Sequence, residues 1–257
     1  MGLRETFDEV PELYDRVRPG YPEELFDHLA ELVGLRPRSR VLELGCGTGQ
    51  ATLPLARRGY EVIAIELGAA LAEVARRKLA AFASTRVVNA AFEEWLLPAE
   101  PFDVVVAATS FHWMDPAVRL AKSADALRPG GALAVISTHH VAGGDAAFFA
   151  EVQPCYELWM PGTPTGLRLP AAADVPYERE EFDGSGRFGR VVFRRYEREL
   201  TYSTREYLDL LLSYSNHRAL EPDALRALLA CIARLIDGRF GGRVTKPYLT
   251  ELALAYT

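Results

Sequence analysis

One segment, VLELGCGTGQ at positions 41–50, constrains the fold of this chain more than any other. An apolar run of strand character carries an acid, Glu43, near its end, and Gly45, Gly47 and Gly49 follow at alternate positions. Glycine reaches backbone conformations that other residues avoid, and it lets a ligand approach the main chain closely. The segment therefore predicts a buried strand followed by a ligand-binding turn.

Strand and helix patterns alternate from about residue 38 to residue 138. Such alternation is typical of a parallel sheet whose strands are joined by crossover helices. Strands are expected at 40–45, 60–66, 85–90, 102–109 and 132–138. Helices are expected at 49–58, 69–82 and 116–127, with Gly59 as a C-terminal cap and Asp115 as an N-cap. The second helix is expected to bury one face, made of Leu71, Val74, Ala75 and Leu79.

The alternation ends after Ser137. We expect loops over the Pro- and Gly-rich residues 161–190, a sixth strand over 191–200, helices opening at 203 and 222, and a seventh strand over 244–256. Ser203 and Glu206 have the spacing of a capping box. Pro247 cannot donate to a strand ladder, so it is expected near a strand end or at a free edge.

Charge and composition exclude several classes of function. The net charge of −6, without any block of Lys and Arg, argues against a nucleic-acid partner. The apolar runs fall short of the roughly 20 residues that cross a bilayer, and the first ten residues lack the basic and apolar regions of a secretory signal. Cys46, Cys155 and Cys231 lack zinc-ligand spacing, so we expect no metal site and reduced thiols in a cytoplasmic protein.

The glycine turn distinguishes between cofactors. A P-loop requires a Lys that is absent here, which excludes nucleoside triphosphate hydrolysis. The dinucleotide fingerprint fits at Gly45 and Gly47, but Gln50 occupies the position of its third glycine. Glu43 would repel a diphosphate and suits a cofactor with a cationic end. Glu66 ends the second strand, where a carboxylate can accept both ribose hydroxyls.

These motifs resemble those of the class I S-adenosylmethionine-dependent methyltransferases. The resemblance rests on ELGCGTG (43–49), IE (65–66), FDVVVAATSFHW (102–113) and LRPGG (127–131). YDRVRPGYP (14–22) and TYSTREYLDLLLSYSNH (201–217) are similar to the bacterial small-molecule branch of that family. The resemblance implies a three-layer α/β fold of Rossmann-like type. Its seven-stranded, mostly parallel sheet has the order 3-2-1-4-5-7-6, with strand 7 antiparallel and helical lid insertions.

The resemblance also implies how the chain is organised and what it does. We expect a single methyltransferase domain over 1–257, with an N-terminal flap and helix at 1–34 and substrate lid insertions at 138–190 and 203–240. Residues 1–20 are interpreted as a flap that orders on cofactor binding; a solvated tail is the alternative. The implied activity is methyl transfer from S-adenosylmethionine to a small-molecule acceptor, by a cytoplasmic monomer or homodimer.

Carried over by position, the cofactor-binding residues are Tyr14, Arg18, Glu43, Gly45, Gly47, Gly49, Glu66, Leu67, Phe92 and Thr109. The glycines would pass the methionine and ribose parts, Glu66 would bind the ribose hydroxyls and Leu67 would pack on adenine. Arg18 would pair with the cofactor carboxylate, and Tyr14 would cover the sulfonium. Ala90 and Ala91 stand where many relatives have Gly-Asp, so adenine would be read by the backbone near Phe92, with Asn89 or Glu93 helping.

His112 follows the fourth strand, where active-site residues of open α/β sheets gather, and is the candidate catalytic residue. Its alternative role is to fix the loop after that strand. The other histidines are His139, His140 and His217, which remain candidates, and His28, which is expected to be structural. An acceptor pocket would be walled by Trp113, Trp159, Tyr202, Tyr207 and Tyr214. Two alternatives stay open: a nicotinamide-dependent oxidoreductase, and a non-methylating S-adenosylmethionine-binding enzyme such as a cyclase.

Overall fold

The computed structural model describes residues 8–257, so the first part of the predicted flap lies outside the described residues. The chain divides into two compact units, each assembled from three segments. The glycine-loop unit comprises residues 19–138, 176–196 and 250–257. The helical unit comprises the described residues through Arg18, 139–175 and 197–249. Each unit is described here by itself.

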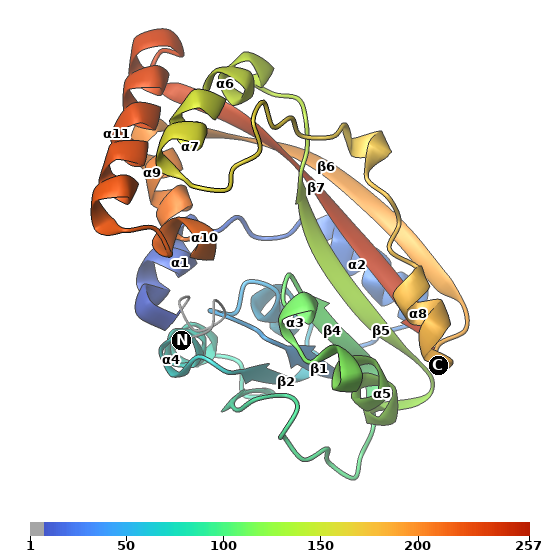
Figure 1. Ribbon diagram of the computed structural model, residues 1–257. Coiled ribbons are helices and arrows are strands. Elements are labelled where there is room, and N and C mark those ends of the chain that lie inside the picture. Colours follow the sequence, from blue (N-terminus) through green and yellow to red (C-terminus); the bar gives the residue numbers. More distant parts are fainter. Residues whose placement is uncertain (1–7) are drawn as a thin grey trace. The chain divides into compact units, whose positions relative to one another are not determined.

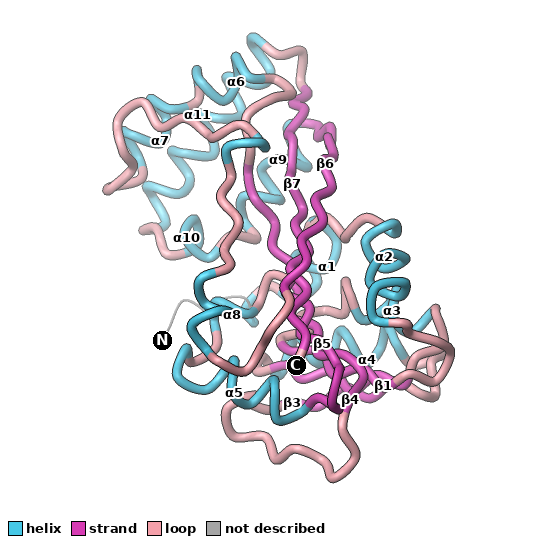
Figure 2. Tube along the Cα trace, turned by 90° about the vertical axis from the view of Figure 1, so that its right-hand side faces the viewer, coloured by secondary structure: helices cyan, strands magenta, loops and turns pink. Residues whose placement is uncertain are grey.

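The glycine-loop unit follows the alternation that the sequence predicts. Its strands are β1 (Arg40–Leu44), β2 (Glu61–Glu66), β3 (Thr85–Asn89) and β4 (Phe102–Ala108). Its helices are α2 (Glu23–Val33), α3 (Thr52–Arg57), α4 (Ala69–Leu79), α5 (Pro116–Ala126), α8 (Glu180–Ser185) and a 3₁₀ turn at Phe111–Trp113. Helices α2 and α3 contact each other, as Figure 2 shows. Gly59 follows α3 with a φ of 79°, and the Asp115 carboxylate caps α5, as predicted.

Three long strands, β5 (Leu127–His140), β6 (Val191–Ser203) and β7 (Arg243–Tyr256), contribute residues to both units. The seven strands form one sheet in the order β3-β2-β1-β4-β5-β7-β6, which confirms the predicted topology (Figure 1). Strand β1 runs parallel to β2 and β4, as do β2 to β3 and β4 to β5. Backbone bonds between Arg190 and Tyr256 and between Asp145 and Thr245 give β7 the opposite direction to its neighbours.

Apolar residues cover both faces of the sheet in the glycine-loop unit. Val41, Val104 and Val106 pack in one cluster with α2 and α3, whereas Leu42 and Val105 pack in another with α5. Burial of both faces is the usual condition of a parallel sheet and gives the three-layer architecture. The face of α4 predicted to be buried is buried along its whole length.

The helical unit consists of α1 (Pro11–Val17), α6 (Ala146–Glu151), α7 (Gln153–Trp159), α9 (Thr204–Leu212), α10 (Ser215–Arg218), α11 (Pro222–Arg239) and a 3₁₀ turn at Ala172–Asp174. Helix α11 packs against α7 and α9 (Figure 1). The predicted capping box is present: Glu206 N donates to Ser203 Oγ at 3.3 Å, and Ser203 N donates to Glu206 Oε2 at 2.7 Å. Pro222 opens α11, as predicted.

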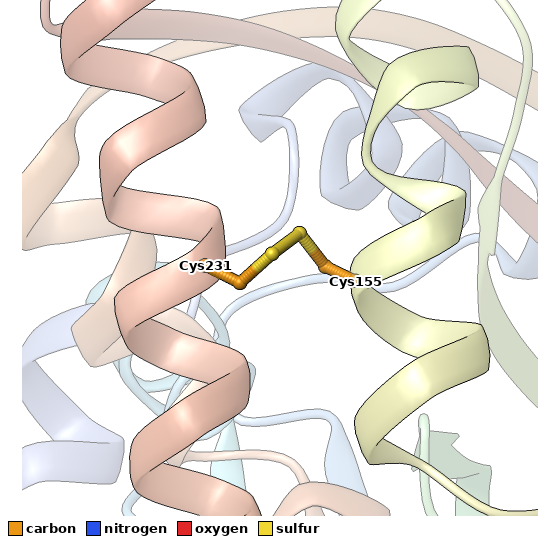
Figure 3. Close-up of a disulfide and its surroundings, with 2 residues drawn as sticks. All are labelled: Cys155 and Cys231. Atoms are coloured by element: carbon orange, nitrogen blue, oxygen red, sulfur yellow. A yellow bond between two sulfur atoms is a disulfide. The ribbon is translucent and has the colours of Figure 1, made fainter.

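Two cysteines depart from the prediction. Cys155 on α7 and Cys231 on α11 form a disulfide, with a Cα–Cα distance of 5.9 Å (Figure 3). The expectation of three reduced thiols is therefore wrong for this pair, and Cys46 is the free, buried cysteine of the described chain. Their separation of 76 residues concealed the contact, because only the packing of α7 on α11 brings the two positions together.

Other elements differ in extent. Helix α1 was not predicted, and α8 lies within residues expected to form loops. Pro247, expected near a strand end or a free edge, is the fifth residue of β7, a strand flanked by neighbours on both sides. Strand β5 ends at His140, and Gly144 approaches Pro247 so closely that an added Cβ would lie 3.1 Å from the proline ring. The proline therefore faces a turn rather than a continuing strand.

Candidate functional site

The glycine turn after β1 is built from left-handed backbone. Gly45, Gly47 and Gly49 have φ angles of 66°, 57° and 84°. A Cβ at Gly45 would lie 2.7 Å from the Cβ of Ser110, which is too close for any side chain there. The Ser110 hydroxyl donates to the Leu44 carbonyl at 2.5 Å and so joins the ends of β1 and β4. The turn thus depends on glycine both for its conformation and for its packing.

Glu66 links the glycine turn to the end of β2. The side chain is buried, and Gly47 N donates to Oε2 at 2.7 Å while Gly68 N donates to Oε1 at 2.8 Å. Each backbone bond fixes one carboxylate oxygen. A carboxylate has about four acceptor positions, so these two backbone bonds alone do not exhaust it. This arrangement suits two vicinal hydroxyls of a ribose.

Glu43 is the most unusual acid of the glycine-loop unit. It is 1 % exposed, and its Oε2 has no hydrogen-bond partner among the described residues. Burial raises the pKa of Glu43 to about 8, and the neighbouring Glu66 adds to the rise while the Thr52 hydroxyl opposes it. A cation beside this carboxyl would favour its ionised form. The buried, unpartnered oxygen therefore fits a cofactor with a positive end.

The residues after β2 and β3 are ordered by side-chain bonds to the backbone. Leu67 is exposed, which leaves an apolar surface beside the turn. Asn89 Nδ2 donates to the carbonyls of Glu66 and Leu67 at 2.9 and 2.8 Å, and Glu93 accepts from Asp115 N at 3.0 Å. Asn89 and Glu93, predicted to help read adenine, thus hold the loops. Phe92 is buried.

The loop after β4 holds two of the predicted residues. Thr109 has a φ of 56°, a costly conformation for a β-branched residue, and its hydroxyl lies 2.9 Å from that of Tyr21. His112 is exposed beside Trp113, and partial burial together with the charge of Arg119 lowers its pKa. His112 is therefore neutral near pH 7 and able to accept a proton. Tyr21 lies in the motif at 14–22 but was not among the predicted site residues.

Two predicted cofactor residues belong to the helical unit. The Arg18 guanidinium lies 5.0 Å from the centre of the Tyr14 ring and 4.3 Å from that of Tyr214, and it donates to the Ser213 carbonyl at 2.7 Å. The other eight predicted cofactor residues lie in the glycine-loop unit. Sequence alone did not indicate that Tyr214 and Ser213 hold Arg18.

The remaining histidines have distinct environments. His28 contacts the Tyr196 hydroxyl at 2.9 Å, a packing contact within the glycine-loop unit. His217 contacts the Tyr156 hydroxyl at 3.2 Å in the helical unit, and burial lowers its pKa to about 4, with Arg18 adding to the effect. His139 and His140 are the last two residues of β5. In residues 8–257 no three His, Cys, Asp or Glu side chains gather into a metal-binding group, and no helix is both long and apolar enough to cross a bilayer.

Sequence comparison identifies relatives of the region that holds the glycine turn. Residues 41–131 match the family model of a methyltransferase domain. An uncharacterized methyltransferase of Mycobacterium tuberculosis is 36% identical over 131 residues, which are 51% of this chain and 51% of that protein. One from Geobacillus kaustophilus is 32% identical over 143 residues, which are 52% of this chain and 66% of that protein. The chain thus spans about half the length of the mycobacterial relative it matches.

The fold extends the likeness beyond the matched region. A structure solved as that of a type II methyltransferase from Anaeromyxobacter dehalogenans is 26% identical, with a TM-score of 0.59, over 93% of this chain and 97% of that one. Because it covers 93% of this chain, the likeness extends well beyond residues 41–131. Residues 41–131 thus carry a methyltransferase domain, and the match and the fold together support a class I S-adenosylmethionine-dependent methyltransferase.

Proposed function

We propose that this protein transfers the methyl group of S-adenosylmethionine to a small-molecule acceptor. The observation that carries the proposal is the pairing of two buried acids at one glycine turn. Glu66 is held by the backbone of Gly47 and Gly68 in a position to receive hydroxyls, and Glu43 keeps a carboxyl oxygen without a partner. A ribose and a cationic methionine end match these two features.

The residues present fit that cofactor, which supplies an activated methyl group on a positively charged sulfur. Glu43 would attract its cationic end, and the glycine turn would admit it close to the backbone. Leu67 offers exposed apolar surface for the base. Because the donor is already activated, the protein mainly has to align the acceptor, an effect worth up to about 7–11 kcal/mol in well-oriented systems.

His112 is the proposed proton acceptor for an alcohol, amine or carbon-acid substrate. Its lowered pKa keeps the imidazole neutral, and its place after β4 puts it on the loop that also carries Thr109. His112→Ala is expected to lower kcat by about 10²–10⁴-fold, the range for loss of a positioned base, with little change in cofactor affinity. Full kcat in this variant would leave His112 with only the loop-fixing role.

Resemblance assigns Tyr14 and Arg18 to the cofactor. The substrate lid insertions and a monomeric or homodimeric state are part of the same proposal. Limited proteolysis with and without S-adenosylhomocysteine tests the flap. Protection at Arg16 and Arg18 by the ligand is expected. Equal cleavage in both states, with full activity after removal of residues 1–18, would rule it out.

A cytoplasmic location is also part of the proposal, because S-adenosylmethionine is a cytoplasmic metabolite. The Cys155–Cys231 disulfide is uncommon in that compartment. Trapping of thiols with an alkylating agent at the moment of lysis, followed by mass spectrometry, gives the redox state of the pair in the cell.

The experiment that tests the function is calorimetry followed by a transfer assay. The protein should bind S-adenosylmethionine and S-adenosylhomocysteine and should not bind NAD. Gly47→Val should abolish binding, because a β-branched residue cannot adopt the left-handed backbone without strain and would fill the space the ligand needs. Gly186→Val is the control, since this glycine has a similar φ of 63° with open space around it. Unchanged affinity in Gly47→Val, or preference for NAD, would contradict the assignment.

A further inference from the structure

Two basic side chains lie beside one aromatic ring in the helical unit, and no carboxylate of the described residues pairs with the lysine among them. The group consists of His140 at the end of β5 and Lys246 on β7, which both lie beside the Tyr248 ring, and we call it the basic cluster. Burial lowers the pKa of His140 to about 3, and the charges of Lys246, Arg18, His139 and His217 all add to this effect. The environment of His140 is therefore strongly electropositive.

Lys246 carries the positive charge of the basic cluster. It is 6 % exposed, and its ammonium lies 5.1 Å from the Phe149 ring centre and 5.4 Å from that of Tyr248. Within residues 8–257 no carboxylate forms an ion pair with it, and burial lowers its pKa to about 8. The amine is thus still mostly protonated near pH 7. A buried charge without a counter-ion is costly, and a fold normally avoids it unless another group supplies the opposite charge.

Two acids contact the backbone around the turn after β5. Asp145 Oδ2 accepts from Thr245 N at 2.6 Å, and Glu199 Oε1 accepts from Gly144 N at 3.2 Å. Side chains of consecutive strand residues point to opposite faces, so the bond to Thr245 does not bring Asp145 to Lys246. Both carboxylates serve the turn after β5 rather than the lysine.

A second, independent observation points to a ligand. Aromatic rings stand beside both members of the cluster. The His140 ring lies 5.7 Å from the ring centres of Tyr214 and of Tyr248. The Tyr248 hydroxyl in turn contacts that of Tyr202 at 3.0 Å. The Lys246 ammonium and the His140 ring thus stand beside aromatic surface, which suits a molecule with an anionic group and an apolar body.

We propose that the basic cluster binds the anionic group, a carboxylate or a phosphate monoester, of the methyl acceptor, whose apolar body lies against Tyr214 and Tyr248. The inference rests on the proposed function, because it names the chemical class of the acceptor. Lys246 provides the counter-charge, and its ammonium donates hydrogen bonds to the anionic group. The ligand would supply the negative charge that residues 8–257 do not place beside Lys246.

Three small probes test this inference on the full chain by calorimetry. Benzoate carries a carboxylate, phenyl phosphate carries a phosphate monoester, and benzamide is the uncharged counterpart of benzoate. At least one anionic probe should bind about tenfold or more tightly than benzamide, the gain expected from a charge-assisted hydrogen bond. The tighter of the two anions identifies the source of the charge. Equal affinity for benzoate, phenyl phosphate and benzamide, or binding of none of them, would overturn the inference.

Variants separate the cluster from general effects of charge. Lys246→Met should remove the preference for the anionic probe, whereas Lys246→Arg should retain at least part of it. Lys78→Met, a charge-matched change on α4 of the glycine-loop unit, should leave the preference unchanged. A preference that survives in Lys246→Met would overturn the inference. S-adenosylhomocysteine binding, measured in the same samples, shows that each variant is folded. Failure of the wild-type protein to bind it would contradict the proposed function separately from the anion site.

Discussion

Replacement of Glu66 by Gln probes the acid that ends β2 with the least change in shape. The wild-type carboxylate accepts one backbone N–H on each oxygen, from Gly47 at 2.7 Å and from Gly68 at 2.8 Å. The Gln amide has one acceptor oxygen and one donor NH₂ group. One of the two backbone N–H groups must therefore face another donor, and an unsatisfied group of this kind costs about 1–3 kcal/mol.

The same change weakens the proposed ribose contact. Hydrogen bonds from hydroxyls to a carboxylate contribute about 1.5–3 kcal/mol, and a neutral amide recovers only part of that. We therefore expect Glu66→Gln to lower the affinity for S-adenosylhomocysteine by about 10–100-fold, and the free energy of unfolding without ligand by about 1–3 kcal/mol. Glu66→Ala should weaken cofactor binding by about 1–3 kcal/mol as well.

Isothermal titration calorimetry measures the affinity, and urea unfolding measures the stability. Glu61→Gln is the matched control, because Glu61 begins the same strand and pairs with Arg38 at the surface rather than with the glycine turn. The control should bind S-adenosylhomocysteine like the wild type. Affinities within twofold of wild type in both Glu66 variants would refute the role assigned to this acid.

Three further predictions follow from the same region and from the disulfide. Gly45→Ala should destabilise the protein by at least about 1–2 kcal/mol in urea unfolding, because alanine is strained at this left-handed φ and its Cβ would lie 2.7 Å from that of Ser110. A free energy of unfolding equal to that of the wild type would contradict this reading of the turn. The pKa of Glu43 in the folded protein is about 8, above its ordinary value of 4.5, so the unfolded chain loses this proton first as pH rises. The free energy of unfolding should therefore fall between about pH 4.5 and pH 8, by up to about 1.4 kcal/mol per pH unit, and level off above that. Glu43→Gln should remove this slope, and parallel pH profiles of the two proteins would contradict the buried acid. Cys231→Ser should lower the free energy of unfolding by about 4 kcal/mol, since the disulfide with Cys155 closes a loop with a separation of 76 residues. Equal urea midpoints for the variant and the wild type under oxidising conditions would show that the disulfide does not form.

The parts of the fold that the sequence predicted are those governed by local pattern. Strand β1 is an apolar run, and the glycines of the turn after it favour left-handed backbone. Gly45 and Gly47 indeed adopt that conformation. The capping box at Ser203 depends on a spacing of three residues, so it was visible without tertiary structure. The strand order came from the family resemblance, because periodicity alone does not order strands in a sheet.

The parts that escaped prediction depend on contacts distant in sequence. The bond between Tyr21 and Thr109 joins residues 88 apart, and the disulfide joins residues 76 apart. Lys246 looked like an ordinary strand lysine, and only the surrounding aromatic packing shows that it is buried. Helix α1 was missed because its seven residues are too few for helical periodicity to be evident.

A crystal structure of the protein with S-adenosylhomocysteine tests the central claim most directly. The account predicts both ribose hydroxyls within about 3 Å of the Glu66 carboxylate oxygens, the amino acid end of the ligand beside the turn at Gly45 and Gly47, and the base against Leu67. A ligand bound elsewhere, or bound with Glu66 contacting only the backbone of Gly47 and Gly68, would contradict it.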